Sequence, residues 1–222
     1  MPKQSTIEIL KQLPILFRKA EVEKWTKHAP TFLSRAGKKG LIHRLSRGYY
    51  VNAFLKGWPA VEEVGCFLRA PAYISVEWAL HKHGLLLQVP QTCTVITLQS
   101  SVGQSRSLEY QGITVEFSRI ASTLFFGFTR EERYDLATAE KALLDLLYLR
   151  GRIPFTDELE LSEVDFERLH QFSKTFPKTV QKKISLLKSS MSIKATFLSK
   201  SLNSILILRP LPAAALATSE GS

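Results

Sequence analysis

The sequence predicts an α+β protein, and three observations lead to that class. Three short helical segments precede a β-hairpin within residues 4–51. Strand-like runs and amphipathic helical segments then share residues 58–190. The composition, with 45% hydrophobic and 23% charged residues in a chain of 222, is ordinary for a globular protein and allows a sizeable core.

The first two predicted elements are short helices. Residues 4–13 form the first, and Pro14 ends it because proline lacks the backbone N–H that a helix needs. Residues 18–27 form the second, in which Val22 and Trp25 lie one turn apart. We expect both of these side chains to face the core.

A third helix and a hairpin follow. Residues 30–39 are predicted to be helical, with Leu33 and Ala36 facing inward. Two β-rich runs within residues 41–51 flank a turn at Gly48, a residue that tolerates positive φ. Three short helices followed by a hairpin is the element order of a winged helix-turn-helix. We therefore assign residues 1–57 to such a domain.

The middle of the chain is predicted to mix both element types, and we assign residues 58–190 to an α+β domain. Hydrophobic periodicity predicts helices over residues 59–69, 75–83, 138–149, 163–172 and 177–190. Ser75 and Thr138 are the expected N-caps of two of them. Apolar and β-branched runs predict strands over residues 89–98, 107–110, 113–117 and 124–128. Residues 191–222 lose the periodicity and form a poorly defined tail.

Charge is distributed unevenly along the chain. The formal net charge is +10, which favours an anionic partner such as nucleic acid. Residues 1–57 carry 12 Lys and Arg against 3 Asp and Glu, a net charge of +9. Residues 58–167 carry a net charge of −7, and residues 168–222 carry +8. This asymmetry predicts separate roles for the segments.

Other function classes receive little support. Cys66 and Cys93 are the only cysteines, and their wide separation predicts neither a disulfide framework nor a zinc site. The polar N-terminus lacks the apolar stretch of a signal peptide, and no apolar run reaches the roughly 20 residues that a membrane span needs. We expect a cytoplasmic protein without a membrane segment, metal or cofactor, and without enzymatic activity.

The predicted DNA interface consists of polar and basic residues of the third helix and the hairpin: Thr31, Ser34, Arg35, Lys38, Lys39, Arg44 and Arg47. Arg35 has the forked donors that match guanine, and Thr31 and Ser34 suit base edges or phosphate. Lys38 and Lys39 suit phosphate, whereas Arg44 and Arg47 give the hairpin a positive charge. The alternative is a solvated basic face, but the +9 charge, the helix order and the hairpin together favour DNA binding.

Other side chains are expected to be structural. His81 and His83 are two residues apart on a helix and point to different faces, so a shared metal is not expected. Cys93 lies in an apolar strand and is expected to be a buried thiol. Lys141 and Asp145 are four residues apart and are expected to form a weak pair. Acidic side chains are expected to lie on the solvated surface in three clusters, at residues 62–63, 131–132 and 157–160.

Three stretches of the chain resemble one known family. They are residues 41–50 (LIHRLSRGYY), 71–85 (PAYISVEWALHKHGL) and 137–147 (ATAEKALLDLL). In sequence, order and spacing they are similar to AbiEi-family proteins, the antitoxins of type IV toxin–antitoxin systems. The likeness covers residues 5–150 well and 151–190 loosely.

The resemblance implies an N-terminal winged helix joined to a C-terminal antitoxin domain. It implies a repressor that binds double-stranded DNA at inverted repeats near its own promoter. The functional counterpart is a nucleotidyltransferase-like toxin, with which a stable complex is not expected. Two alternatives stay open, namely an enzyme that a winged helix targets to nucleic acid, and a protein-interaction module whose acidic middle binds a basic partner.

Overall fold

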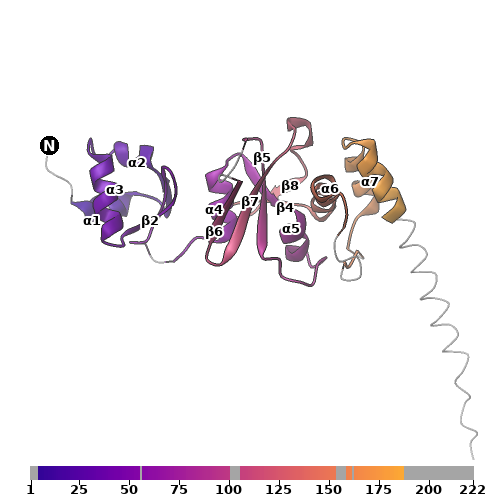
Figure 1. Ribbon diagram of the computed structural model, residues 1–222, viewed down its shortest axis with the longest axis horizontal. Coiled ribbons are helices and arrows are strands. Elements are labelled where there is room, and N and C mark those ends of the chain that lie inside the picture. The colour runs from indigo at the N-terminus through magenta and orange to yellow at the C-terminus, as the bar shows by residue number, and fades with distance from the viewer. Residues whose placement is uncertain (1–4, 56, 101–105, 154–158, 162, 188–222) are drawn as a thin grey trace, which may run out of the picture. The chain divides into compact units, whose positions relative to one another are not determined.

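The described part of the chain contains helices and two β-sheets, which confirms the α+β class (Figure 1). The computed structural model describes residues 5–55, 57–100, 106–153, 159–161 and 163–187. The chain divides into two compact units, residues 1–176 and 177–222. In the second unit, residues 178–187 are helical; the rest of the predicted helix and the predicted tail lie outside the described residues.

The N-terminal part of the first unit packs three helices against a small antiparallel sheet. Its elements are α1 (Thr6–Gln12), β1 (Leu16–Arg18), α2 (Lys19–Glu23), α3 (Ala29–Lys38), β2 (Ile42–Ser46) and β3 (Tyr49–Asn52). The sheet order is β1-β3-β2. Its core is formed by buried apolar side chains of all three helices and of the sheet, among them Leu10, Phe17, Val22, Leu33, Ala36 and Ile42.

Local signals and one buried amide hold these elements together. Ser5 and Glu8 form a capping box at the start of α1, which satisfies backbone N–H groups that the helix leaves free. The buried side chain of Asn52 donates to the carbonyl oxygens of Leu10 and Leu13, at 2.8 and 3.2 Å. Strand β3 is thereby tied to the end of α1.

Two expectations for this region are wrong in detail. The second helix is shorter than predicted, and Trp25 is 41% exposed and does not face the core. The strand β1 directly before it was not expected. It forms because Phe17 pairs with Tyr50 of β3 and is fully buried. A strand of three residues is too short to show an alternating pattern in the sequence.

The rest of the first unit is built on a mixed sheet of six strands in the order β6-β7-β5-β4-β9-β8. Pairs β5–β7 and β4–β9 are parallel and the others are antiparallel. The strands are β4 (Ala72–Ser75), β5 (Thr92–Thr97), β6 (Ser107–Tyr110), β7 (Ile113–Arg119), β8 (Phe128–Arg130) and β9 (Asp135–Ala137). The helices are α4 (Val61–Leu68), α5 (Val76–Lys82), α6 (Ala139–Arg150), α7 (Phe166–Ser173) and the short η2 (Ser122–Leu124).

The predicted helices and the hairpin of this region are present, but some strands differ. The expected strand over residues 124–128 is wrong, because the chain there leaves η2 and enters β8 only at Phe128. Strands β4 and β9 were not predicted. All four residues of β4 are buried, so the strand shows no alternation of apolar and polar side chains.

A buried polar network joins α6 to β4. Lys141 and Asp145 of α6 form an ion pair, and both side chains are fully buried. The Lys141 Nζ also donates to the Tyr73 hydroxyl at 2.7 Å. The Tyr73 and Ser75 hydroxyls in turn donate to the Asp145 carboxylate, at 3.0 and 2.8 Å. Each polar atom of the pair therefore has a partner, as buried charges require.

Aromatic rings enclose the ammonium of Lys141. Its Nζ lies 5.1, 5.5 and 5.2 Å from the ring centres of Tyr73, Phe126 and Phe176. Rings at this distance attract a cation through the negative charge on their faces. Burial raises the pKa of Asp145 and lowers that of Lys141, while the attraction between the two groups opposes both shifts.

Two sequence-based expectations are corrected by this network. The pair of Lys141 and Asp145 is not a weak surface contact, because both residues lie in the core. Ser75 occupies the N-cap position of α5 but its side chain makes no capping bond, since it donates to Asp145 instead. Thr138 does cap α6, where its hydroxyl accepts from the backbone N–H of Lys141.

Replacing Lys141 with methionine should strongly destabilise the protein. The substitution leaves the Asp145 carboxylate buried without its cation, so we expect the free energy of unfolding in urea to fall by about 3–5 kcal/mol. The control Arg130→Gln breaks a pair with Asp135 in which Arg130 is 68% exposed, and it should cost at most about 1 kcal/mol. The double variant Lys141→Met/Asp145→Leu should regain part of the loss. Equal losses in Lys141→Met and Arg130→Gln would contradict this account.

Candidate nucleic-acid interface

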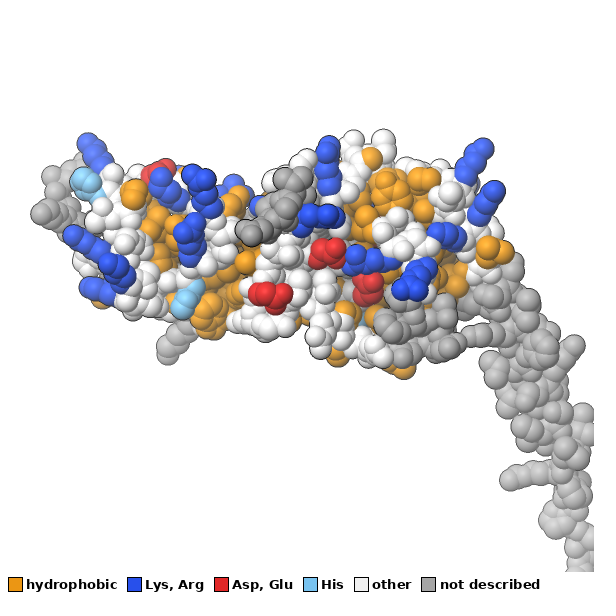
Figure 2. All heavy atoms as spheres, in the orientation of Figure 1, with side chains coloured by type: hydrophobic (Ala, Val, Ile, Leu, Met, Phe, Trp, Pro, Cys, Tyr) orange, Lys and Arg blue, Asp and Glu red, His pale blue; other side chains and the backbone are white. Residues whose placement is uncertain are grey.

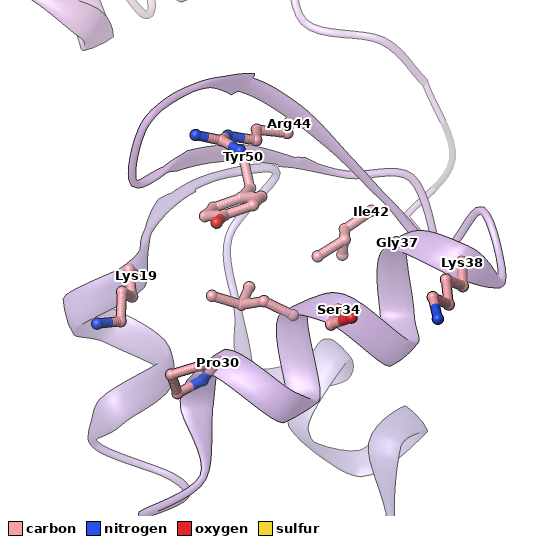
Figure 3. Close-up of a pocket in the computed structure, with 9 residues that line it drawn as sticks. Lys19, Pro30, Ser34, Gly37, Lys38, Ile42, Arg44 and Tyr50 are labelled. Atoms are coloured by element: carbon pink, nitrogen blue, oxygen red, sulfur yellow. The ribbon is translucent and has the colours of Figure 1, made fainter.

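A groove of about 490 Å³ lies between α3, the start of α2 and the β2–β3 hairpin (Figure 3). The residues that line it come from all of these elements: Lys19, Pro30, Leu33, Ser34, Gly37, Lys38, Ile42, Arg44 and Tyr50. Three of these side chains are cationic, and none of the described lining residues is acidic. The groove is thus a concave surface suited to an anion.

The periodicity of the two main elements explains the lining. Helix α3 contributes residues three or four apart, such as Pro30, Ser34 and Lys38, because these share one face of a helix. Strand β2 contributes Ile42 and Arg44, which are two apart and share one face of the strand. Tyr50 pairs with Arg44 across the hairpin.

The predicted interface residues are all exposed, but only some of them meet in the groove. Ser34, Lys38 and Arg44 line it. The others lie outside it, with Thr31 and Arg35 elsewhere on α3, Lys39 at its C-cap and Arg47 at the hairpin turn. Among the described residues, no ion pair is formed by Arg35, Lys38 or Arg47, so their charges are available to a ligand.

A register shift and a glycine with positive φ shape the β2–β3 hairpin around Arg44 and its turn. The hairpin register shifts between Arg44 and Ser46, and the Nε of Arg44 donates to the Ser46 carbonyl oxygen at 3.3 Å. Gly48 has a φ of 84°, a conformation that glycine adopts without the steric cost of a Cβ.

Figure 2 shows that Lys and Arg dominate the charged side chains on the visible face of residues 5–55.

Lys19 is the cationic lining residue of the groove that the sequence did not single out. Its backbone N–H donates to the Gly48 carbonyl oxygen at 2.8 Å, which brings the start of α2 beside the hairpin. Its ammonium lies 3.1 Å from the Glu23 carboxylate, and both side chains are about half exposed. No spacing along the chain relates Lys19 to Arg44, because the strand pairing of β1 with β3 creates their proximity.

The acidic middle of the chain is engaged in internal contacts. Ion pairs join Glu62 to Lys82, Glu63 to Arg133, Asp135 to Arg130, Glu140 to Arg168, and both Glu77 and Glu116 to Arg150. These carboxylates already have cations beside them within the same unit. That arrangement gives little support to an open acidic surface for a basic partner.

Glu62 departs from the surface position expected for it. Its side chain is buried, accepts from the Trp78 indole at 3.0 Å and lies 2.8 Å from the Lys82 ammonium. Glu131 and Glu132 are exposed as expected, whereas residues 157 and 158 of the third acidic cluster lie outside the described residues.

The two cysteines, His81 and His83 are held in structural environments. Burial raises the pKa of the Cys66 thiol to about 12 and also raises that of Cys93, which is buried as expected. Thiols with raised pKa values are poor nucleophiles near neutral pH. The rings of His81 and His83 bond to the backbone carbonyl oxygens of different segments, at Leu86 and Ala137.

The chain matches no protein-family model and no curated protein. Within the described ranges, no group of three or more His, Cys, Asp and Glu is placed to hold a metal ion. The described part of the chain also contains no helix with the length and apolar character needed to cross a membrane.

The buried carboxyl of Glu62 should make the free energy of unfolding depend on pH. Burial raises the pKa of this carboxyl, but the hydrogen bonds from Lys82 and Trp78 outweigh it and leave the pKa below its usual 4.5. The stabilisation that Glu62 contributes is therefore complete at pH values above its unfolded-state pKa. It is lost as the pH falls through the lower folded-state pKa. We expect the urea midpoint to drop between about pH 6 and about pH 3, and to drop less in Glu62→Gln. The exposed control Glu131→Gln should follow the unmodified protein, and an identical drop in Glu62→Gln would refute the role of this carboxyl.

Proposed function

We propose that residues 1–57 form a winged helix-turn-helix that binds double-stranded DNA. The observation that carries the proposal is the groove that Lys19, Lys38 and Arg44 line, in which no described lining residue is acidic. The order α1-β1-α2-α3-β2-β3 supports it, because α3 then takes the place of the recognition helix and β2–β3 that of the wing.

Each exposed side chain has a role suited to its chemistry. Arg35 projects from α3 outside the groove and can present its forked donors to a guanine edge, with Thr31 beside it on the helix. Lys38 and Lys39 supply point charges for phosphates. Arg47 at the hairpin turn is exposed and suits a narrow minor groove.

The proposal extends to the role of the whole chain. We propose a repressor of its own operon that acts as the antitoxin of a type IV system, opposing a nucleotidyltransferase-like toxin without a stable complex. The three family-like stretches support it, and each of them forms a defined part of the fold. Residues 41–50 span most of the β2–β3 hairpin, residues 71–85 contain β4 and α5, and residues 137–147 contain most of α6.

Binding to the chain's own upstream DNA tests the first part. Gel-shift titration of a duplex carrying the promoter region, compared with a scrambled duplex, should show preferential binding that weakens steeply with salt. The salt dependence follows from the counterions that phosphate contacts release. Equal affinity for both duplexes would exclude a sequence-specific regulator.

Two substitutions, one on α3 and one at its C-cap, should separate base contacts from phosphate contacts. Arg35→Ala should lower the affinity for the specific duplex by about 1–3 kcal/mol and leave that for the scrambled duplex nearly unchanged. Lys39→Ala should weaken binding to both duplexes alike and reduce the salt slope by about one. Both side chains are exposed, so thermal unfolding should match that of the unmodified protein. A uniform loss in Arg35→Ala would assign Arg35 to phosphate.

A further inference from the structure

We infer that the groove between α3 and the β2–β3 hairpin holds the sugar–phosphate backbone of one DNA strand, and that Lys19 contacts a phosphate there. The inference rests on the proposed function and deepens it. It adds a contact from α2, an element outside both the helix and the hairpin on which the interface was predicted.

The lining of the groove matches a sugar–phosphate chain. Pro30, Leu33 and Ile42 are its apolar lining residues, and Lys19, Lys38 and Arg44 are its cationic ones. A DNA strand likewise alternates apolar deoxyribose with anionic phosphate. Arg35, whose forked donors match a guanine edge, lies on α3 outside the groove. The groove therefore suits backbone contact, whereas reading of bases is left to side chains outside it.

The spread of the cations favours an extended ligand. In Figure 3, Lys19 and Lys38 lie toward opposite ends of the groove, with Arg44 and Tyr50 on the hairpin between them. A single small anion contacts one end only, but successive phosphates of a strand can contact both. Charge complementarity thus points to a polyanion.

The existing partner of Lys19 does not prevent this contact. Lys19 and Glu23 are 47% and 50% exposed, and an exposed pair of this kind is weak because water and salt screen it. The position of Lys19 is secured by its backbone bond to Gly48, which a side-chain substitution leaves in place. Lys19 can therefore be changed without disturbing the groove.

The test measures binding of the full chain to promoter and scrambled duplexes of about 20 base pairs by fluorescence anisotropy, over about 50 to 300 mM salt. Lys19→Gln should weaken binding to both duplexes by the same factor, about five- to tenfold at 0.1 M salt, and reduce the salt slope by about one. Lys19→Arg should retain the slope. The matched control Lys11→Gln removes an equal charge from an exposed position of α1 outside the groove and should leave the slope unchanged.

The outcomes separate this inference from the proposed function. If the unmodified protein prefers its promoter duplex and Lys19→Gln binds with unchanged affinity and slope, the inference is overturned and the proposed function stands. A loss in Lys19→Gln confined to the promoter duplex would make Lys19 a base contact and would also overturn the inference. If the unmodified protein binds neither duplex, the proposed function itself fails.

Discussion

The buried ion pair between Lys141 and Asp145 is the interaction on which the larger sheet and its helices depend. Two charges removed from water are tolerated in a core only when every remaining donor and acceptor is satisfied. Tyr73 and Ser75 supply those partners from β4, and the ring of Phe176 covers the ammonium from the end of the unit. The positions of β4, α6 and the segment after α7 are therefore coupled through one contact.

This coupling joins two of the three stretches on which the proposed antitoxin role rests. Residues 71–85 contain Tyr73 and Ser75, and residues 137–147 contain Lys141 and Asp145. The two stretches thus meet in one buried network that holds the domain together. Of the three stretches, only residues 41–50 contain cations of the proposed interface, Arg44 and Arg47. The proposals on DNA and on toxin therefore rest on different parts of the chain.

The N-terminal elements separate structural residues from exposed ones. Buried apolar residues and Asn52 hold α1, α3 and the hairpin, and none of these contacts uses a cation of α3 or β2. The charges of Arg35 and Lys38 are left toward solvent, where a polyanion can reach them. In the acidic middle of the chain, by contrast, many carboxylates are paired with cations of the same unit, as Glu62 is with Lys82.

The sequence by itself determined the elements whose signals are local, and with them the exposure of the predicted interface residues. Periodicity and caps located α3 and α6, and Gly48 marked the hairpin turn. Only the tertiary structure decided that β1 and β4 are strands, that Lys141 is buried, and that Lys19 joins Arg44 in one groove. The reason is that a local pattern shows which side chains share a face. What covers that face depends on strand pairing between residues far apart in the chain.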